Sequence, residues 1–189
     1  MTVKIENVVV AASFPQKLDL LTVANAFRKV EYRPDVFPGL VFRLKRPKTA
    51  ILIFGSGKMV CTGAKSEKEA IGAVRKVARE LRKGGIKVYG VPEIRVTNIV
   101  ASADLGGFID LDELASQRVG GRILYEPEQF PALIYRWVNP KVVFLVFSTG
   151  KIVCAGAKKE VEIYDAVESF RSMLEIGGFL VKEKLGDAI

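Results

Sequence analysis

The sequence predicts an α+β fold of two similar halves whose strands merge into one sheet. The main observation is an internal repeat: residues 32–67 align without a gap on residues 125–160, with 18 of 36 positions identical. In addition, strand-like runs cluster within each half, and each half ends in a longer amphipathic helix. Two copies are too few for a solenoid, so we expect a pseudo-twofold molecule. We place the first repeat at residues 1–92 and the second at residues 93–189, without a linker.

Strands are predicted where short apolar runs rich in β-branched residues are bounded by turn residues. The first repeat has four such runs and the second repeat has four matching ones. A turn with two prolines follows Tyr32 and its copy Tyr125. The predicted strands cover residues 3–12, 39–46, 49–54, 58–63, 95–103, 132–139, 142–148 and 151–156.

Two helices in each repeat are predicted from apolar residues that recur every three or four positions. A short helix follows the first strand of each repeat, and its copy in the second repeat covers residues 110–118. The longer helices cover residues 66–83, with Ser66 as N-cap and Gly84-Gly85 as the end, and residues 160–175. The expected buried faces are Leu18, Leu21, Ala24 and Phe27; Ala70, Val74, Val77 and Leu81; and Tyr164, Val167, Phe170 or Arg171, and Leu174.

Strand alternation leaves one apolar face of the sheet without helices. Leu52 and Phe54 share a face of their strand, and Asn7 and Val9 share a face of theirs. Helices can cover only one face of the merged sheet, and an open apolar face of this size promotes aggregation unless it is an interface. The alternative is that both faces are buried in an ordinary layered core.

Basic residues occur at matching positions next to these strands. Three of them in each repeat border the predicted open face: Arg43, Lys48, Lys58, Arg136, Lys141 and Lys151. An apolar strip edged with cations suits the minor groove of DNA, whose walls are sugars and whose rims are phosphates. The net charge of +8 also indicates a polyanionic partner.

The two halves differ in charge although they share a pattern. Residues 1–94 carry 18 Lys and Arg against 8 Asp and Glu, whereas residues 95–189 carry 11 against 13. The helix at 66–83 is basic and the helix at 160–175 is acidic. The alternative for such helix charges is a merely solvated surface. We expect that this asymmetry tells protein partners which half is which.

Composition argues against an enzyme, a metalloprotein and a membrane protein. The chain has no His, and its two cysteines, Cys61 and Cys154, lie in apolar strands where we expect small buried side chains. We therefore predict no metal site and no cofactor. No apolar run approaches the roughly 18–20 residues that span a bilayer, and the N-terminus is unlike a signal peptide. We expect the chain in the cytoplasm with the DNA.

Three segments resemble the TATA-box-binding proteins in their compact archaeal form. They are IFGSGKMVCTGAK at residues 53–65, VFSTGKIVCAGAK at residues 146–158 and YEPEQFP at residues 125–131. The resemblance covers essentially the whole chain. It implies a saddle with one curved antiparallel sheet of ten strands, four helices on the convex side and DNA under the concave side.

The resemblance also implies roles for residues at matching positions. Phe37, Phe54, Phe130 and Phe147 match the four phenylalanines with which the family wedges open base steps and kinks DNA. Asn7 and Asn98 match the central asparagines, which can donate to the acceptors of A·T pairs in the minor groove. Thr62 matches a base-contacting threonine, but its repeat copy is Ala155, which departs from the pattern. The apolar groove-contacting set is matched by Val9, Val100, Leu52, Leu145, Val60 and Val153.

The implied function is that of a general transcription initiation factor without enzymatic activity. Such a protein binds and bends promoter DNA at a TATA box and recruits transcription factor B and RNA polymerase. Glu126 and Glu128 match the family's contact with transcription factor B. Two alternatives from other classes are a nuclease or glycosylase accessory module and a general minor-groove architectural or single-strand-binding protein. Dimerisation of the free protein through its apolar face is left open.

Overall fold

The computed structural model describes residues 1–117 and 122–182. Residue Arg118, the end of a predicted helix, lies outside the described residues. The described helices are α1 (Leu20–Ala26), α2 (Glu67–Lys83), α3 (Leu111–Ser116) and α4 (Glu160–Ile176). The described strands are β1 (Thr2–Ser13), β2 (Val30–Tyr32), β3 (Leu40–Lys45), β4 (Lys48–Ile53), β5 (Lys58–Ala64), β6 (Glu93–Asp104), β7 (Phe108–Ile109), β8 (Arg122–Leu124), β9 (Leu133–Trp137), β10 (Val142–Val146), β11 (Lys151–Ala157) and β12 (Leu180–Val181).

Ten of these strands form one sheet in the order β2-β3-β4-β5-β1-β6-β11-β10-β9-β8. The order reads the same way from both edges, with β1 and β6 at the centre, as the sequence repeat requires. The small strands β7 and β12 pair separately. The predicted α+β fold, with a ten-stranded sheet and four helices in the described part of the chain, is therefore confirmed.

The chain divides into two compact units. One unit comprises residues Asn7–Asn98, and the other comprises Met1–Glu6 together with Ile99–Ile189. We call them the first-half unit and the second-half unit. Each long central strand contributes residues to both units. The boundary between the sequence repeats at residues 92 and 93 stays a prediction.

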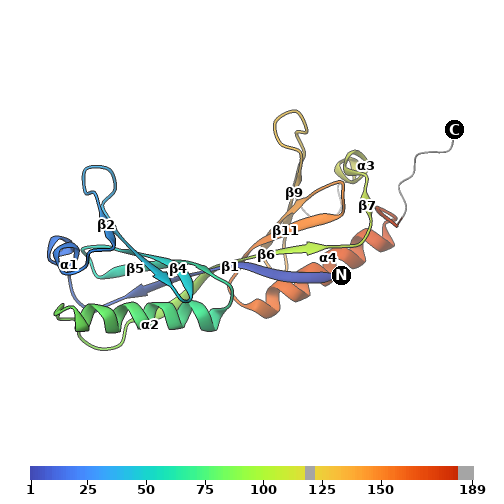
Figure 1. The fold of residues 1–189 in the computed structure, drawn as a ribbon. Helices are drawn as coiled ribbons and strands as arrows, with labels where there is room; N and C mark the ends of the chain where they lie inside the picture. The colour runs from blue at the N-terminus through green and yellow to red at the C-terminus, as the bar shows by residue number, and fades with distance from the viewer. Residues whose placement is uncertain (118–121, 183–189) are drawn as a thin grey trace. The chain divides into compact units, whose positions relative to one another are not determined.

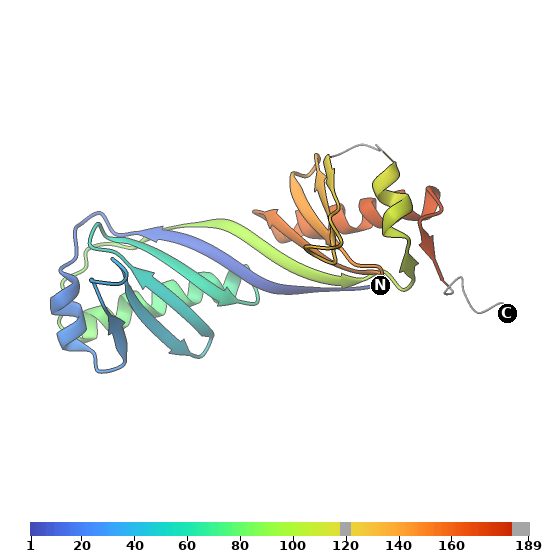
Figure 2. The ribbon, with the colours of Figure 1, turned by 90° about the horizontal axis from the view of Figure 1, so that it is seen from above.

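In the first-half unit, α2 covers one face of the strands. Its predicted apolar residues Ala70, Val74, Val77 and Leu81 are fully buried, and Ser66 caps it by accepting a hydrogen bond from the Glu69 backbone N–H at 3.1 Å. Figure 1 shows α2 along one side of β4 and β5. In Figure 2, where the unit is seen from above, the strands lie in front of this helix.

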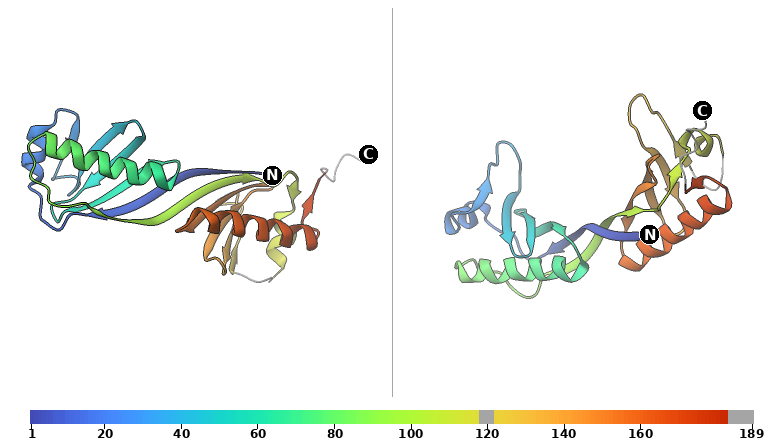
Figure 3. Two further views of the ribbon diagram at one scale, coloured as in Figure 1. Left: turned by 90° about the horizontal axis from the view of Figure 1, so that it is seen from below. Right: turned by 45° about the vertical axis from the view of Figure 1, so that its right-hand side comes forward.

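In the second-half unit, α4 covers the strands in the same way and adds an aromatic cluster. Phe170 of α4 stacks on Phe144 of β10, with ring centroids 4.3 Å apart, and lies edge-on to Tyr135 at 5.3 Å. All three rings are fully buried. Figure 3 shows α4 in front of its strands when the unit is seen from below. The cluster fixes which face of this unit is the core.

Two predicted helix faces are wrong in part. In the first short helix the buried residues are Leu20 and Val23, whereas Leu21 is 60% exposed. The reason is the start of the helix: the Asp19 carboxylate accepts hydrogen bonds from Leu21 N and Thr22 N, so α1 begins at Leu20 and its face is rotated. Leu18 is buried ahead of the helix, and Phe27 ends it in an extended conformation.

The face predicted for α4 is also shifted by one side chain. Tyr164 is 47% exposed, and Ile163 takes the buried position instead. Both residues lie within one turn of Val167, so the apolar spacing alone does not distinguish them.

Among the described residues, no helix is both long enough and apolar enough to cross a bilayer.

Candidate nucleic-acid interface

The first-half unit has an open apolar face opposite α2. Strand alternation turns Val8, Ile51 and Cys61 toward the helix, where they are fully buried. Leu52 and Val60 are half-buried on the other face and lie opposite each other across β4 and β5. No described helix of this unit covers that face, as Figures 2 and 3 show. The prediction of an open face is therefore preferred over that of a layered core.

The second-half unit repeats this face with matching residues. Leu145 of β10 pairs with Val153 of β11, and Val153 pairs with Ser102 of β6. Val100 pairs with Ala155 in the same unit and is also half-buried. Val9 of β1 is half-buried between the fully buried Val8 and Val10, which alternation turns to the helix side. The six predicted groove-contacting apolar residues thus lie on the helix-free faces of their strands.

Four phenylalanines lie at repeat-equivalent turns that border these faces. In the turn before β3, the Arg33 carbonyl accepts a hydrogen bond from Phe37 N at 2.9 Å. The copy before β9 has the same bond, from Phe130 N to the Glu126 carbonyl, also at 2.9 Å. Phe37 and Phe130 are 39% and 43% exposed. Both rings are therefore accessible before any ligand is bound.

The other two phenylalanines follow β4 and β10. Phe54 N donates to the Lys58 carbonyl at 2.9 Å, and Phe147 N donates to the Lys151 carbonyl at 3.0 Å. Each bond closes a short turn into the next strand. Both rings are half-buried. Each repeat therefore carries two phenylalanines in equivalent turns, Phe37 and Phe54 in the first and Phe130 and Phe147 in the second.

Asn7 is held by a β-bulge in β5. Between β1 and β5 the register moves by one residue, from Val8 opposite Ala64 to Val10 opposite Cys61. Gly63 supplies the extra residue with φ of 97°, a conformation that favours glycine. The bulge aims Gly63 N–H at the Asn7 Oδ1, which accepts it at 2.7 Å.

The bulge also orients the amide nitrogen of Asn7. Asn7 Nδ2 donates to Thr62 Oγ1 at 3.0 Å. An amide has two N–H donors, and the second finds no partner among the described residues. Because Oδ1 already accepts the backbone N–H, the amide cannot flip without loss. Asn7 is therefore a fixed hydrogen-bond donor on the open face.

The equivalent position in the second repeat lacks part of this arrangement. Asn98 is half-buried on β6, and the strand opposite has a matching bulge, with Gly156 at φ of 107°. Thr62, however, is replaced by Ala155, which has no hydroxyl. The two asparagines therefore differ in their possible partners.

The six predicted phosphate-contacting cations are all exposed. Arg43 lies on the open side of β3, and its Nε is 3.8 Å from the Glu31 Oε1 in a solvent-exposed ion pair. Such a pair contributes little and is easily exchanged for a phosphate. Lys58 and Lys151 begin β5 and β11 beside the phenylalanine turns. These positions fit cations along the rim of the apolar face.

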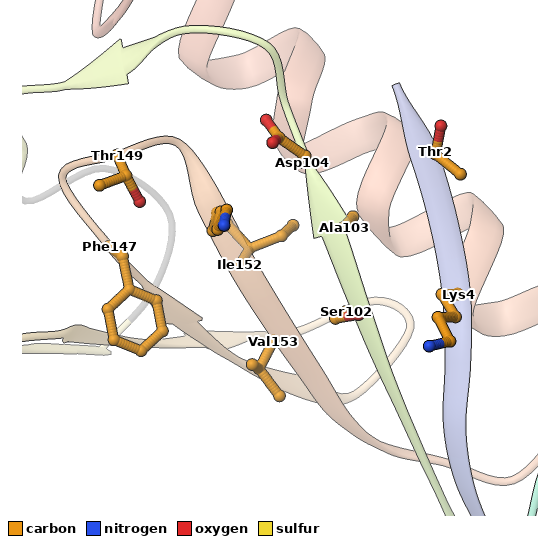
Figure 4. Close-up of a pocket in the computed structure, with 10 residues that line it drawn as sticks. Thr2, Lys4, Ser102, Ala103, Asp104, Phe147, Thr149, Ile152 and Val153 are labelled. Atoms are coloured by element: carbon orange, nitrogen blue, oxygen red, sulfur yellow. The ribbon is translucent and has the colours of Figure 1, made fainter.

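The sequence analysis did not identify two further cations that border the open faces, Lys4 and Arg95. A pocket in the second-half unit is lined by Lys4, Phe147 and Val153, and Figure 4 shows Lys4 on β1 at the border opposite Phe147. A matching pocket in the first-half unit is lined by Arg95 and Phe54. Lys4 and Arg95 stand three residues before Asn7 and Asn98, and alignment of the repeats on the asparagines is the signal that finds them.

Glu6 adds an acid close to Lys4. Its Oε1 accepts a hydrogen bond from the Ser102 hydroxyl at 2.8 Å and lies 3.8 Å from Lys4 Nζ. Part of the charge of Lys4 is therefore balanced within the protein.

The cysteines are unsuited to catalysis. Cys61 and Cys154 are free and buried, as predicted. Burial raises the pKa of the Cys61 thiol from 9.0 to about 11, although a hydrogen bond with Thr49 lowers it in part. Burial also raises the pKa of the Cys154 thiol to about 12. Neither thiol forms a nucleophilic thiolate near neutral pH.

Among the described residues, no group of three His, Cys, Asp or Glu side chains could hold a metal ion. Glu126 and Glu128, the predicted partner contacts, are exposed in the turn that carries Phe130. Their exposure indicates a contact surface next to the open face and not a catalytic cluster.

Comparison with known proteins gives the family context of these features. The model of the family described as transcription factor TFIID, or TATA-binding protein, matches residues 2–84 and 93–176. The TATA-box-binding protein of Pyrodictium occultum is 49% identical over 174 residues, covering 92% of this chain and 86% of that protein. The TATA-box-binding protein of Methanococcus aeolicus is 46% identical over 173 residues, covering 92% and 94%.

Solved structures agree with the sequence relatives. The chain is similar to the Methanococcus jannaschii TBP structure, with a TM-score of 0.83 and 46% identity. The similarity covers 93% of this chain and 99% of that one. Fold and sequence therefore lead to the same family.

Proposed function

The chain belongs to the TATA-binding protein family, a family of DNA-binding transcription factors rather than enzymes, and on this premise we propose that it binds TATA-box promoter DNA in the minor groove. The match of the family over both repeats is the main support. It removes the accessory module of a nuclease or glycosylase from consideration. The structure adds two matching open faces, each apolar and bordered by cations.

The apolar faces support binding in the minor groove with little direct base readout. The half-buried Leu52, Val60, Leu145 and Val153 can pack against sugars and base edges but cannot hydrogen-bond to them. Asn7 and Asn98 supply amides for the N3 and O2 acceptors of A·T pairs, where the amine of guanine would be in the way. Preference for easily kinked TA steps then supplies most of the specificity.

The four phenylalanines are the proposed wedges. Each pair lies at the border of an open face, where a ring can enter between base pairs and unstack them. Unstacking costs free energy, which the longer contact with bent DNA offsets. Rings that are partly exposed before binding are already free of the core, so their insertion leaves no cavity behind.

Binding of a labelled duplex at several salt concentrations tests this function. We expect tighter binding to an A·T-rich duplex with TA steps than to a G·C-rich duplex of the same length. Six phosphate contacts predict a slope of log K against log[salt] of about −5. Lys58→Ala should make the slope shallower by about 0.9, whereas Lys68→Ala on α2 should leave it unchanged. Equal affinity for both duplexes would instead support the general architectural protein.

We further propose that the bound protein recruits transcription factor B and then RNA polymerase. Glu126 and Glu128 support this because they are exposed beside Phe130, whereas the first repeat has Arg33 and Asp35 at these positions. A partner that binds the acidic turn would therefore bind only one half. The relatives are archaeal, so we place the protein with the DNA in the cytoplasm. Self-association through the open faces would compete with DNA.

A further inference from the structure

One pair of repeat-equivalent residues differs directly beneath the proposed wedges. Gly39 follows Phe37 by two positions, and its copy Ala132 follows Phe130 by two positions. Both residues are buried. The backbone turns around them have the same hydrogen bonds, so the extra methyl group of Ala132 is added to a similar backbone.

In the first-half unit, the missing methyl group makes room for a ring pair. A Cβ on Gly39 would lie 2.7 Å from Phe37 Cε1, closer than real Cβ contacts allow, and 3.0 Å from Phe54 Cε1, which is a tight contact. The Phe37 and Phe54 rings use this space and pack edge to face, with centroids 5.9 Å apart and an interplanar angle of 69°. Such geometry is favourable for aromatic rings.

In the second-half unit, the methyl group of Ala132 occupies the equivalent place. Ala132 is 2% exposed, so its side chain lies within the packed layer under the turn. Phe130 and Phe147, both within the described residues, form no ring pair like that of Phe37 and Phe54. The phenylalanine pair of the first repeat and that of the second are therefore packed differently before DNA is bound.

We propose that Gly39 and Ala132 are positioning residues: they make the packing of the two phenylalanine pairs unequal. The two ends of the DNA site then become distinguishable. This inference rests on the proposed function. The paired rings of the first repeat are already ordered, so they lose less freedom on insertion than Phe130 and Phe147 do. Phe37 and Phe54 should therefore contribute to DNA binding as one unit, whereas Phe130 and Phe147 should contribute independently.

Double-mutant cycles on a self-complementary duplex of alternating T and A test this inference. On such DNA both orientations of the protein are equivalent, so any difference between the ends comes from the protein. We expect the Phe37→Ala and Phe54→Ala effects on Kd to be coupled by about two- to tenfold. The Phe130→Ala and Phe147→Ala effects should be nearly independent.

Exchange of the two small residues should move the coupling. Gly39→Ala should remove it from the first pair, and Ala132→Gly should create it in the second. Gly39 lies outside the left-handed region of φ, and the clashing atoms belong to ring edges, so the alanine should displace the Phe37 ring rather than unfold the turn. Gly72→Ala, where a Cβ meets nothing within 4 Å, is the matched control and should leave both couplings unchanged.

Nuclear Overhauser contacts between the rings of the free protein provide a second measurement without DNA. Contacts between Phe37 and Phe54 should be present in the wild type and lost in Gly39→Ala. Contacts between Phe130 and Phe147 should be absent in the wild type and present in Ala132→Gly. Equal couplings in the two phenylalanine pairs would overturn this inference and leave the proposed function standing. So would couplings that neither Gly39→Ala nor Ala132→Gly changes. A protein with no preference for the A·T duplex would overturn the proposed function as well.

Discussion

At the scale of single residues, the Asn7 side chain illustrates how the backbone prepares a donor for DNA. Its Oδ1 is occupied by Gly63 N–H at 2.7 Å, and its Nδ2 donates to Thr62 Oγ1 at 3.0 Å. A loose amide would have to be ordered when DNA binds, whereas this one is already fixed. The hydroxyl of Thr62 therefore acts through Asn7, in addition to any contact of its own with a base.

Thr62→Val tests this role because it keeps the shape of the side chain and removes the hydroxyl. We expect affinity for an A·T-rich duplex to fall by roughly two- to tenfold, the value of one ordinary hydrogen bond. Thr62→Ser keeps the hydroxyl and should bind like the wild type. In an Asn7→Ala background, Thr62→Val should cost almost nothing. An undiminished loss in that background would mean that Thr62 contacts the base directly and does not position Asn7.

At this scale, strand alternation and the family resemblance supplied the predictions, and side-chain packing lay beyond both. The alternation of β4 and β5 placed Leu52, Val60 and Cys61 on their observed faces. The ring pair of Phe37 with Phe54 could not be predicted, because it depends on a clash that only the three-dimensional turn reveals. Lys4 and Arg95 were missed because they lie outside the gapless part of the repeat.

At the scale of elements, the sequence predicted all four described helices, but only for α2 was the predicted buried face right throughout. In α2 the apolar period runs for almost five turns and ends at Gly84, so one register fits. In α1, seven residues bury only Leu20 and Val23, and the Asp19 cap decides where the helix starts. The three-residue edge strands β2 and β8 are too short to show alternation. Their existence followed from the family resemblance alone.

The N-termini of the two long helices form a natural comparison. Ser66 caps α2, and the Glu69 carboxylate accepts a hydrogen bond from Lys65 N at 2.8 Å. At the equivalent position of α4 stands Lys159, where Glu162 Oε2 accepts from the Lys158 and Lys159 backbone at 2.9 and 3.3 Å. The second helix thus keeps the glutamate of the capping arrangement but has a cation where an acceptor is preferred.

We expect Ser66→Ala to lower the free energy of unfolding by about 1 kcal/mol and Lys159→Ser to raise it by a similar amount. Removal of the lysine also removes a positive charge from the positive end of the helix dipole. Urea denaturation followed by circular dichroism measures both changes. Ser66→Asp retains an acceptor and should keep the stability of the wild type. A stability of Lys159→Ser below that of the wild type would show that the lysine has another role in the fold.

At the scale of the whole molecule, the residues that the repeats share serve the proposed DNA binding, and the residues in which they differ serve its direction. Residues that both repeats share form the open faces: the phenylalanines, the asparagines, the apolar strand residues and the bordering cations. The excess of 10 positive charges in residues 1–94 and of 2 negative charges in residues 95–189 is not shared. An apolar face with similar residues in both halves orients the protein only weakly on DNA. Features outside that face must therefore supply most of the direction.

The acidic turn of the second repeat is the feature best placed to do so, and charge reversal tests it. We expect Glu126→Lys with Glu128→Lys to abolish the ternary complex with transcription factor B and DNA in a gel-shift experiment. Binary DNA binding should persist or strengthen slightly at low salt, because the new lysines lie near the phosphates and their effect is screened by ions. Asp35→Lys changes the copy of Glu128 in the first repeat and should leave the ternary complex intact. If DNA binding and the ternary complex were lost together, the turn would serve the DNA interface itself, and direction would have to come from the unequal wedges.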